Sequence, residues 1–405
     1  MITDPATGDL VKLLASHRPG FSLAREFYED PAVFAADVDR VIARRWHYAG
    51  HVSECPVPGS YFLDEIAGES VIVIRGRDQA IRAVHNVCRH RGSRICTEPA
   101  GSVKALVCPY HAWNYGLDGR LASAPAMGED FDPSRYRLKP CAVRVLAGLI
   151  FVCLGEPLGD IDQLISDATP FLVPHGLEQA RVAKTLRWPT RANWKLVVEN
   201  FTECYHCRPA HPEFCSVMDI ALPATTGNPV LKAKHQAFLR EWEERVRQQG
   251  FVTGDINRIE DAGYRVHRHP IGRGKLSQSR EGRPVAPLLG RYSEYDGGIT
   301  GLALRPLFSL YVSNDHAVVI RFVPHGPTQT DTVISWLVRS DAEEGRDYDL
   351  HQLTWLWRVT TDQDKVIVED NQAGVSSRAY EPGPYSPLVE PNPPVFHRWY
   401  FGHLR

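Results

Sequence analysis

Two pairs of cysteine and histidine constrain this chain of 405 residues more than any other feature of its sequence. The first pair, Cys88 and His90, has the spacing Cys-x-His. After seventeen further residues the second pair, Cys108 and His111, has the spacing Cys-x2-His. Glycine and proline beside these residues favour tight turns, so we expect each pair at the tip of a loop between β-strands. Each pair offers one thiolate and one imidazole to a metal.

Three interpretations of these four residues are open on spacing alone. They could be a chance grouping of core residues. They could form a structural zinc site, because zinc accepts two cysteines and two histidines in tetrahedral geometry. They could hold a Rieske [2Fe–2S] centre, in which two histidines replace two cysteines on one iron. Nine cysteines in a chain whose first residues lack the apolar core of a secretory signal favour metal chemistry over disulfides.

Composition narrows the class of protein. The 46 basic and 48 acidic residues give a net charge of −2, which offers no global basic field for nucleic acid or an anionic membrane. Apolar residues make up 43% and charged residues 23%, as in globular proteins. The longest strongly apolar stretch, residues 146–154, is far shorter than the about 20 residues of a membrane span. We therefore expect a cytoplasmic protein of two or three domains, without nucleic-acid or membrane partners.

The hydrophobic pattern predicts an α+β protein with three parts. Residues 1–45 read as a helical lead-in, and 46–155 as short strands of an all-β domain. Residues 156–405 mix strands with segregated helices. In this last part we expect strands over 181–188, 308–322 and 332–338, helices over 193–206, 228–249 and 341–371, and a long loop over 251–300.

A second candidate metal site surrounds His206 and His211. The two histidines are five residues apart, which is about 140° around an ideal helix, so one unbroken helix would not point both at one ion. Pro209 and Pro212 break the helix after His206 and allow His211 to return from a loop. Taken alone, the pair could also be two satisfied interior histidines or a zinc site.

A carboxylate from the predicted C-terminal helix could complete this site. Asp364 falls on the mostly apolar stripe of that helix, where an unpaired acid is costly to bury, whereas Asp362 falls on the polar stripe. A facial triad of two histidines and one carboxylate is typical of non-haem Fe(II). Asn200, Glu203 and His206 recur every three residues, which places them on one stripe of the predicted helix 193–206.

Longer motifs around these residues resemble a known family. The run CRHRGSRIC followed by CPYHAWNYGLDGRL resembles the Rieske domain of ring-hydroxylating-type oxygenases. The later pattern N-x2-(D/E)-x2-H-x4-H with a C-terminal aspartate resembles the α subunit of Rieske non-haem iron oxygenases. By this resemblance Cys88 and Cys108 bind one iron of the cluster, and His90 and His111 bind the other.

The resemblance also implies the second domain and its chemistry. The catalytic domain would have a helix-grip (START-like) fold with an antiparallel sheet, and His206, His211 and Asp364 would hold an Fe(II) that reacts with O2. Subunits would form a homotrimer, in which Glu203 links His206 to a cluster histidine of the neighbouring subunit. Asn200 and Glu203 are thus the candidate catalytic residues beside the iron.

Shorter motifs indicate the substrate class and the source of electrons. The run Glu-Cys-Tyr-His-Cys at 203–207 resembles the branch that acts on quaternary ammonium compounds, such as glycine-betaine and proline-betaine demethylases and choline monooxygenase. We expect N-demethylation or hydroxylation of a betaine-like small molecule. Because no G-x-G-x-x-G fingerprint is present, electrons from NAD(P)H would arrive through a separate flavin and iron–sulfur reductase. Alternatives are a hydroxylase or O-demethylase of an aromatic acid, a Rieske electron carrier, and a zinc-stabilised binding module.

A betaine pocket should combine aromatic faces for the cation with a basic group for the carboxylate. The aromatic candidates in the sequence are Phe201, Phe308, Tyr311 and Phe322. The candidates for the carboxylate are Arg208, Arg305 and Arg321.

Overall fold

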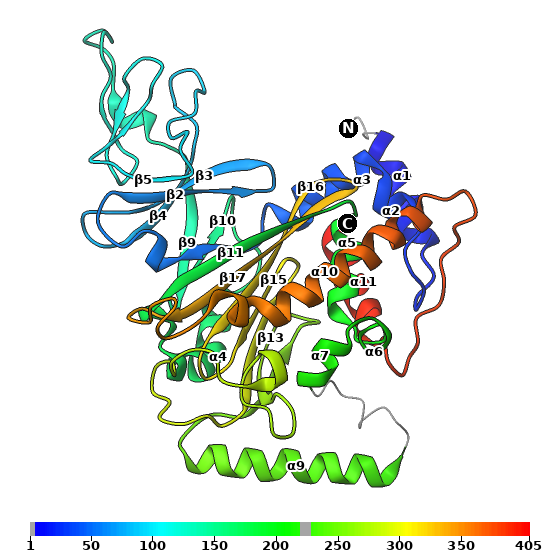
Figure 1. Cartoon of the computed structure of the whole chain (residues 1–405). Coiled ribbons are helices and arrows are strands. Elements are labelled where there is room, and N and C mark those ends of the chain that lie inside the picture. The colour runs from blue at the N-terminus through cyan, green and yellow to red at the C-terminus, as the bar shows by residue number, and fades with distance from the viewer. Residues whose placement is uncertain (1–4, 219–227) are drawn as a thin grey trace. The chain divides into compact units, whose positions relative to one another are not determined.

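The computed structural model describes residues 5–218 and 228–405, which form two compact units (Figure 1). The first unit is Ala43–Ile161. The second unit joins the residues up to Ile42 with Asp162–Arg405. The domain limits drawn from the sequence, at residues 46 and 155, stay a prediction. Within the described ranges, no helix combines the length and the apolar character that a bilayer crossing requires.

The first unit is all-β, as predicted. A seven-stranded antiparallel sheet has the order β1-β10-β9-β4-β3-β2-β5, and a three-stranded sheet has the order β6-β7-β8. The strands are β1 (His47–His51), β2 (Ser60–Ile66), β3 (Glu69–Arg75), β4 (Ile81–His85), β5 (Ala100–Ser102), β6 (Leu106–Val107), β7 (Asn114–Tyr115), β8 (Leu121–Ser123), β9 (Pro140–Leu146) and β10 (Leu149–Cys153). Short 3-10 turns cover Val52–Glu54 and Pro133–Tyr136.

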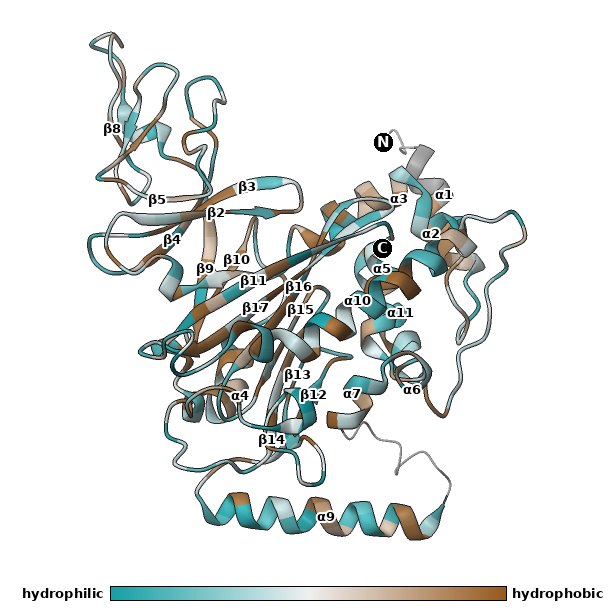
Figure 2. Cartoon of the chain, viewed as in Figure 1, coloured by the Kyte–Doolittle hydropathy of each residue, from teal (hydrophilic) through white to brown (hydrophobic). Residues whose placement is uncertain are grey.

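A second antiparallel sheet forms the centre of the second unit. Its order is β11-β17-β16-β15-β14-β13-β12, and hydrophobic residues dominate the central strands (Figure 2). Helices α5 and α10 pack on this sheet, α5 against β16 and α10 against β11 (Figure 1). The strands are β11 (Ala180–Thr190), β12 (Gly254–Arg258), β13 (Tyr264–Pro270), β14 (Gly298–Leu304), β15 (Phe308–Val312), β16 (Ala317–Gly326) and β17 (Gln329–Arg339).

The second unit also contains helices. They are α1 (Pro5–Ser16), α2 (Glu26–Glu29), α3 (Pro31–Ala36), a π-helical turn (Asp37–Ile42), α4 (Ile161–Leu172), α5 (Trp194–Thr202), α6 (Cys207–Ala210), α7 (Pro212–Val217), α9 (Pro229–Gln248), α10 (Leu350–Val375) and α11 (Asn392–Leu404). Short 3-10 turns cover Val173–His175, Leu177–Gln179 and Arg280–Gly282. The expected helix over 228–249 is confirmed as α9, whose N-cap is Asn228.

The prediction of one long loop over 251–300 was wrong, because β12, β13 and the start of β14 lie there. In β13 the side chains of Tyr264, Val266 and Arg268 are buried at alternate positions. A buried arginine interrupts the apolar period, and its charge is compensated by Asp296, whose Oδ2 accepts a hydrogen bond from Arg268 Nη2 at 2.6 Å. Because one of its buried positions carries a charge, β13 lacks the alternation of apolar and polar residues by which a strand is recognised in a sequence.

Two predicted helices extend beyond the helices that the structure shows. Helix α10 begins at Leu350, where the side chain of Asp349 accepts a hydrogen bond from the Gln352 amide, and not at residue 341. Helix α5 ends at Thr202, and Glu203 has an extended backbone (φ −127°, ψ 166°). The single helical stripe through residues 200, 203 and 206 therefore does not exist.

The N-terminal segment is anchored to α5 by a buried ion pair. The Lys195 ammonium contacts Asp37 Oδ2, and both side chains are fully buried. Tyr400 donates a hydrogen bond to Asp37 Oδ1 at 2.5 Å, and Trp194 Nε1 donates to Oδ2 at 3.0 Å. Three side chains, two from α5 and one from α11, thus meet around the carboxylate of Asp37, which sets the position of α5 in the second unit.

Candidate metal centres and the adjoining cavity

Two similar turns of the first unit position the cysteine–histidine pairs. In each turn the cysteine amide donates to the carbonyl five residues later at 2.8 Å, and the amide four residues later donates back to the cysteine carbonyl at 3.0 Å. Gly92 and Ala112 hold the equivalent positions and have positive φ angles of 78° and 56°. Cys88 and Cys108 therefore occupy matching places in the two turns.

In both turns the cysteine side chain is buried and the histidine side chain is exposed. Cys88 and Cys108 are buried, and the Cys88 Sγ lies 3.2 Å from the Tyr115 hydroxyl. Burial raises the pKa of the Cys88 thiol. His90 and His111 are exposed, and their Nδ1 atoms lie 3.1 Å apart. The two thiols thus lie beneath the two imidazoles.

This separation favours one of the metal centres considered for the site. A tetrahedral zinc ion with bonds of 2.0–2.3 Å would draw all four ligand atoms to within about 4 Å of one another. Among the described residues, the only group of three or more potential ligands that meets at 4.8 Å lies elsewhere. A pair of sulfurs and a separate pair of nitrogens instead fit two irons, one held by each pair.

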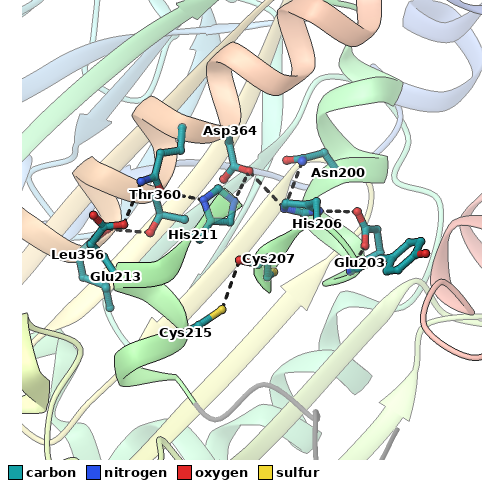
Figure 3. A network of polar contacts seen from close by, with 12 residues as sticks. Asn200, Glu203, His206, Cys207, His211, Glu213, Cys215, Leu356, Thr360 and Asp364 are labelled. Atoms are coloured by element: carbon teal, nitrogen blue, oxygen red, sulfur yellow. Dashed lines mark hydrogen bonds and ion pairs between the residues drawn. The ribbon is translucent and has the colours of Figure 1, made fainter. Parts of the chain in front are cut away.

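The group that does meet at this distance is His206, His211 and Asp364 (Figure 3). His211 Nε2 lies 2.9 Å from Asp364 Oδ1, and His206 Nε2 lies 3.4 Å from the same oxygen. Two imidazoles and one carboxylate that converge in this way fit a mononuclear non-haem iron with open coordination positions. The structure therefore brings together the three residues that the sequence singled out.

The route by which these residues converge differs from the predicted one. His206 is the N-cap of α6, and His211 joins α6 to α7. Pro209 lies inside α6, and Pro212 is the first residue of α7, where proline needs no amide donor. Helix α5 ends before His206, and α6 ends at His211, whose backbone is not helical (φ −123°, ψ 64°). The expected break after His206 is therefore confirmed, and a second break before His206 was not predicted.

Hydrogen bonds orient both imidazoles toward Asp364. Glu203 contacts His206 Nδ1 (Figure 3). Gln363 Oε1 lies 2.8 Å from His211 Nδ1. Such partners fix the tautomer that leaves Nε2 for a metal. Burial lowers the pKa of His206, but the hydrogen bonds to Asp364 and Glu203 outweigh it and raise that pKa to about 10. Sequence analysis missed Gln363, although it adjoins Asp364.

Asn200 also borders this centre. Its Nδ2 lies 3.3 Å from His206 Nε2, on the side where α5 ends (Figure 3). Glu203 additionally accepts a hydrogen bond from the Tyr205 amide. The two predicted catalytic residues therefore contact the same imidazole, one at each nitrogen.

A small cavity of about 30 Å³, partly open to solvent, adjoins Asp364 and Asn200. It is lined by Thr190, Val197, Asn200, Phe201, Ile320, Phe322, Thr332, Trp357, Thr361, Asp364, Lys365 and Val368. Of the predicted aromatic residues, Phe201 and Phe322 line it, Tyr311 stacks on Trp357 at 5.1 Å, and Phe308 is buried outside the lining. Trp357 was missed, although it precedes Asp364 by seven residues, or two helical turns.

The predicted arginines do not line this cavity. Arg305 is buried elsewhere and donates to the carbonyls of Ile259 and Val395. Arg208 and Arg321 lie outside the lining as well, and the basic side chain present there is Lys365, which also contacts Glu369. The cavity lining therefore contains a basic group, but not one of the three arginines that the sequence suggested.

Comparisons with known proteins cover nearly the whole chain. Residues 177–405 match the ring hydroxylating alpha subunit (catalytic domain) family, and residues 45–145 match the Rieske [2Fe-2S] domain family. The glycine betaine monooxygenase oxygenase subunit of Chromohalobacter salexigens is 40% identical over 98% of this chain and 88% of its own length. That of Pseudomonas aeruginosa is 37% identical over 98% and 92%. A crystal structure of a quaternary ammonium Rieske monooxygenase has the same fold (TM-score 0.73, 24% identity, 97% and 98% covered).

Proposed function

We propose a substrate and a reaction from the premise that this chain belongs to the α subunits of Rieske non-haem iron oxygenases. Members of this family use a Rieske [2Fe–2S] cluster, a mononuclear non-haem iron and O2, and as an oxygenase subunit this chain depends on a separate reductase. The proposed reaction is the N-demethylation of glycine betaine. The methyl group leaves as formaldehyde, and dimethylglycine remains.

The cavity beside Asp364 is the observation that carries this proposal. Glycine betaine has a trimethylammonium group at one end and a carboxylate at the other. Phe201, Phe322 and Trp357 offer aromatic faces, which attract a quaternary ammonium group, and Lys365 offers a positive charge to the carboxylate. The full-length identity with glycine betaine monooxygenase oxygenase subunits supports the same substrate.

The proposed ligands follow from the two centres. His206, His211 and Asp364 hold the mononuclear iron. The cluster is held by Cys88, His90, Cys108 and His111. When bound, these groups supply electron transfer and the activation of O2. The balanced reaction takes glycine betaine, O2, two electrons and two protons to dimethylglycine, formaldehyde and water. Glu203 and Gln363 keep both imidazoles in the metal-binding tautomer, and Asn200 occupies the side of His206 that faces the cavity.

We also propose that the active assembly is a homotrimer in which a cluster passes electrons to the iron of the neighbouring subunit. The family resemblance supports this arrangement. The exposure of His90 and His111 supports it too, because an electron donor must bring these imidazoles to an acceptor. Glu203 would connect the incoming histidine with His206. The reductase would be an NAD(P)H-dependent flavin and iron–sulfur protein, and analytical ultracentrifugation of the pure chain tests the trimer.

A single-turnover experiment tests the substrate. Protein reduced with dithionite and freed of excess reductant is exposed to O2 with glycine betaine, carnitine or a methoxybenzoate. Visible absorbance follows reoxidation of the cluster, and a colorimetric assay measures formaldehyde. We expect reoxidation and formaldehyde with glycine betaine. Formaldehyde with the methoxybenzoate alone, or a hydroxylated arene, would replace the proposal with an aromatic-acid oxygenase.

A further inference from the structure

The orientation of Trp357 in the cavity wall is set by its neighbours. The indole is buried and stacks on Tyr311 with ring centroids 5.1 Å apart and planes at 19°. Phe214 and Phe201 lie at centroid distances of 5.6 and 6.4 Å. A ring enclosed by three aromatic side chains cannot reach solvent with its N–H, so this donor requires a partner inside the protein.

That partner is Gln278, which does not line the cavity. Trp357 Nε1 donates to Gln278 Oε1 at 2.9 Å. The amide of Gln278 cannot flip, because its Nε2 donates to Ser313 Oγ at 2.8 Å and to the Tyr311 carbonyl at 3.4 Å. A flipped amide would place its N–H groups opposite the indole N–H and its oxygen opposite an acceptor. The oxygen therefore always faces Trp357.

The backbone around Gln278 is held equally firmly. Its neighbour Ser277 donates from Oγ to Asp315 Oδ1 at 2.7 Å, and Ser279 Oγ donates to a backbone carbonyl four residues later. Residues 277–279 and 313–316 are fully buried. Part of the segment for which the sequence predicted only a loop thus forms a buried polar anchor behind the aromatic wall.

We propose that Gln278 is a positioning residue that determines specificity for N-methylated cations. By holding the indole N–H away from the cavity, Gln278 leaves only the carbon surface of Trp357 to face the ligand. Such a wall attracts a quaternary ammonium group through its π-face and offers no hydrogen bond to a neutral or anionic group. This inference rests on the proposed function, because it assigns the ligand of the same cavity.

A double-mutant cycle tests the coupling. Gln278→Met removes the acceptor at similar volume, and Trp357→Phe removes the donor. We expect Gln278→Met to raise the calorimetric Kd and the KM of glycine betaine about tenfold, while kcat changes less than about threefold. More O2 should be lost as peroxide for each formaldehyde formed. In the Trp357→Phe background, Gln278→Met should have no further effect on Kd.

Gln372→Met is the matched control. Gln372 is also a buried glutamine, and its Oε1 accepts a hydrogen bond from the Asn193 amide at 2.9 Å outside the cavity lining. Its removal should cost stability in the same way and leave the Kd of glycine betaine unchanged. Equal weakening of binding by both glutamine variants would show that Gln278 acts only through stability and would overturn the inference.

Two further outcomes separate the inference from the proposed function. Wild-type protein that binds no glycine betaine would overturn the proposed substrate. The role of Gln278 is then still tested by fluorescence, because the difference between wild type and Trp357→Phe isolates one of the nine tryptophans. We expect Gln278→Met to shift this difference spectrum and raise its quenching by acrylamide. An unchanged difference spectrum, or additive effects in the cycle, would refute the positioning role.

Discussion

The two metal centres are built in opposite ways. The four predicted cluster ligands lie within residues 88–111, on two turns closed by the same pair of backbone hydrogen bonds. The three residues of the mononuclear centre span residues 206–364 and come from the junctions of α6 and from α10. Local sequence therefore specifies the first centre, whereas the second exists only when α10 packs beside α6 and α7. Changes far from the ligands should disturb the second centre more.

The largest expected effect is the loss of one metal centre while the other stays intact. Asp364→Ala removes the carboxylate from the mononuclear centre, so the iron content should fall from about three to about two per chain and demethylation should be abolished. The visible spectrum of the cluster should stay unchanged. Cys108→Ser should give the reverse pattern, with loss of the cluster colour. Metal analysis and absorbance of both variants measure this, and loss of both metals from either variant would contradict two independent centres.

The next largest expected effect is on the stability of the second unit alone. Lys195→Met leaves Asp37 buried without its cation, which should lower the free energy of unfolding of this unit by about 3–5 kcal/mol. The cluster spectrum should persist at denaturant concentrations that already release the mononuclear iron. Arg82→Met removes the exposed pair with Asp78 in the first unit and should leave both transitions in place. A single shared transition in Lys195→Met would show that the units unfold together.

The difference between a centre built from local turns and one assembled from distant segments also explains which features could be predicted from the sequence. The four cluster ligands were named only through the resemblance of the surrounding motif, because their spacing alone left a chance grouping, a zinc site and an iron–sulfur centre open, and this assignment stays a prediction. His206, His211 and Asp364 were predictable from residue type and helical face, yet the helix between Asn200 and His206 was wrong, because Glu203 adopts an extended backbone whose carboxylate turns back to Tyr205 and His206. Side-chain contacts of this kind end a helix without any breaker residue in the sequence.

The cavity was the least predictable part for a related reason. Its wall depends on a polar anchor, Gln278, from a segment without hydrophobic period, and its basic residue is Lys365, next to a ligand. Trp357 could have been found by extending the helical face of Asp364 by two turns. The contact between residues 278 and 357 joins distant segments, and a single sequence contains no local signal for it.

A smaller effect concerns the group that orients His211. Gln363→Leu removes the hydrogen bond to His211 Nδ1 and should weaken metal binding at the mononuclear centre about 10–100-fold without changing the cluster. Competition with a chelator under anaerobic conditions measures the affinity. Gln352→Leu, at an exposed position in the first turn of the same helix, is the control. Equal affinities of Gln363→Leu and wild type would mean that packing alone fixes the imidazole.

The last prediction concerns the pH dependence of metal uptake, to which His206 and His111 should contribute differently. Hydrogen bonds to Asp364 and Glu203 outweigh burial and raise the pKa of His206 to about 10, so at pH 7 a metal must displace a proton from this imidazole. Affinity for Co²⁺, used as a redox-stable probe of the iron site, should rise about tenfold per pH unit between pH 7 and 9. Partial desolvation and the neighbouring His90 and Arg91 instead lower the pKa of His111, whose imidazole is neutral over that range and releases no proton. Anaerobic titration of the cobalt absorption at several pH values measures the slope, and a flat profile would show that His206 is already neutral before the metal binds.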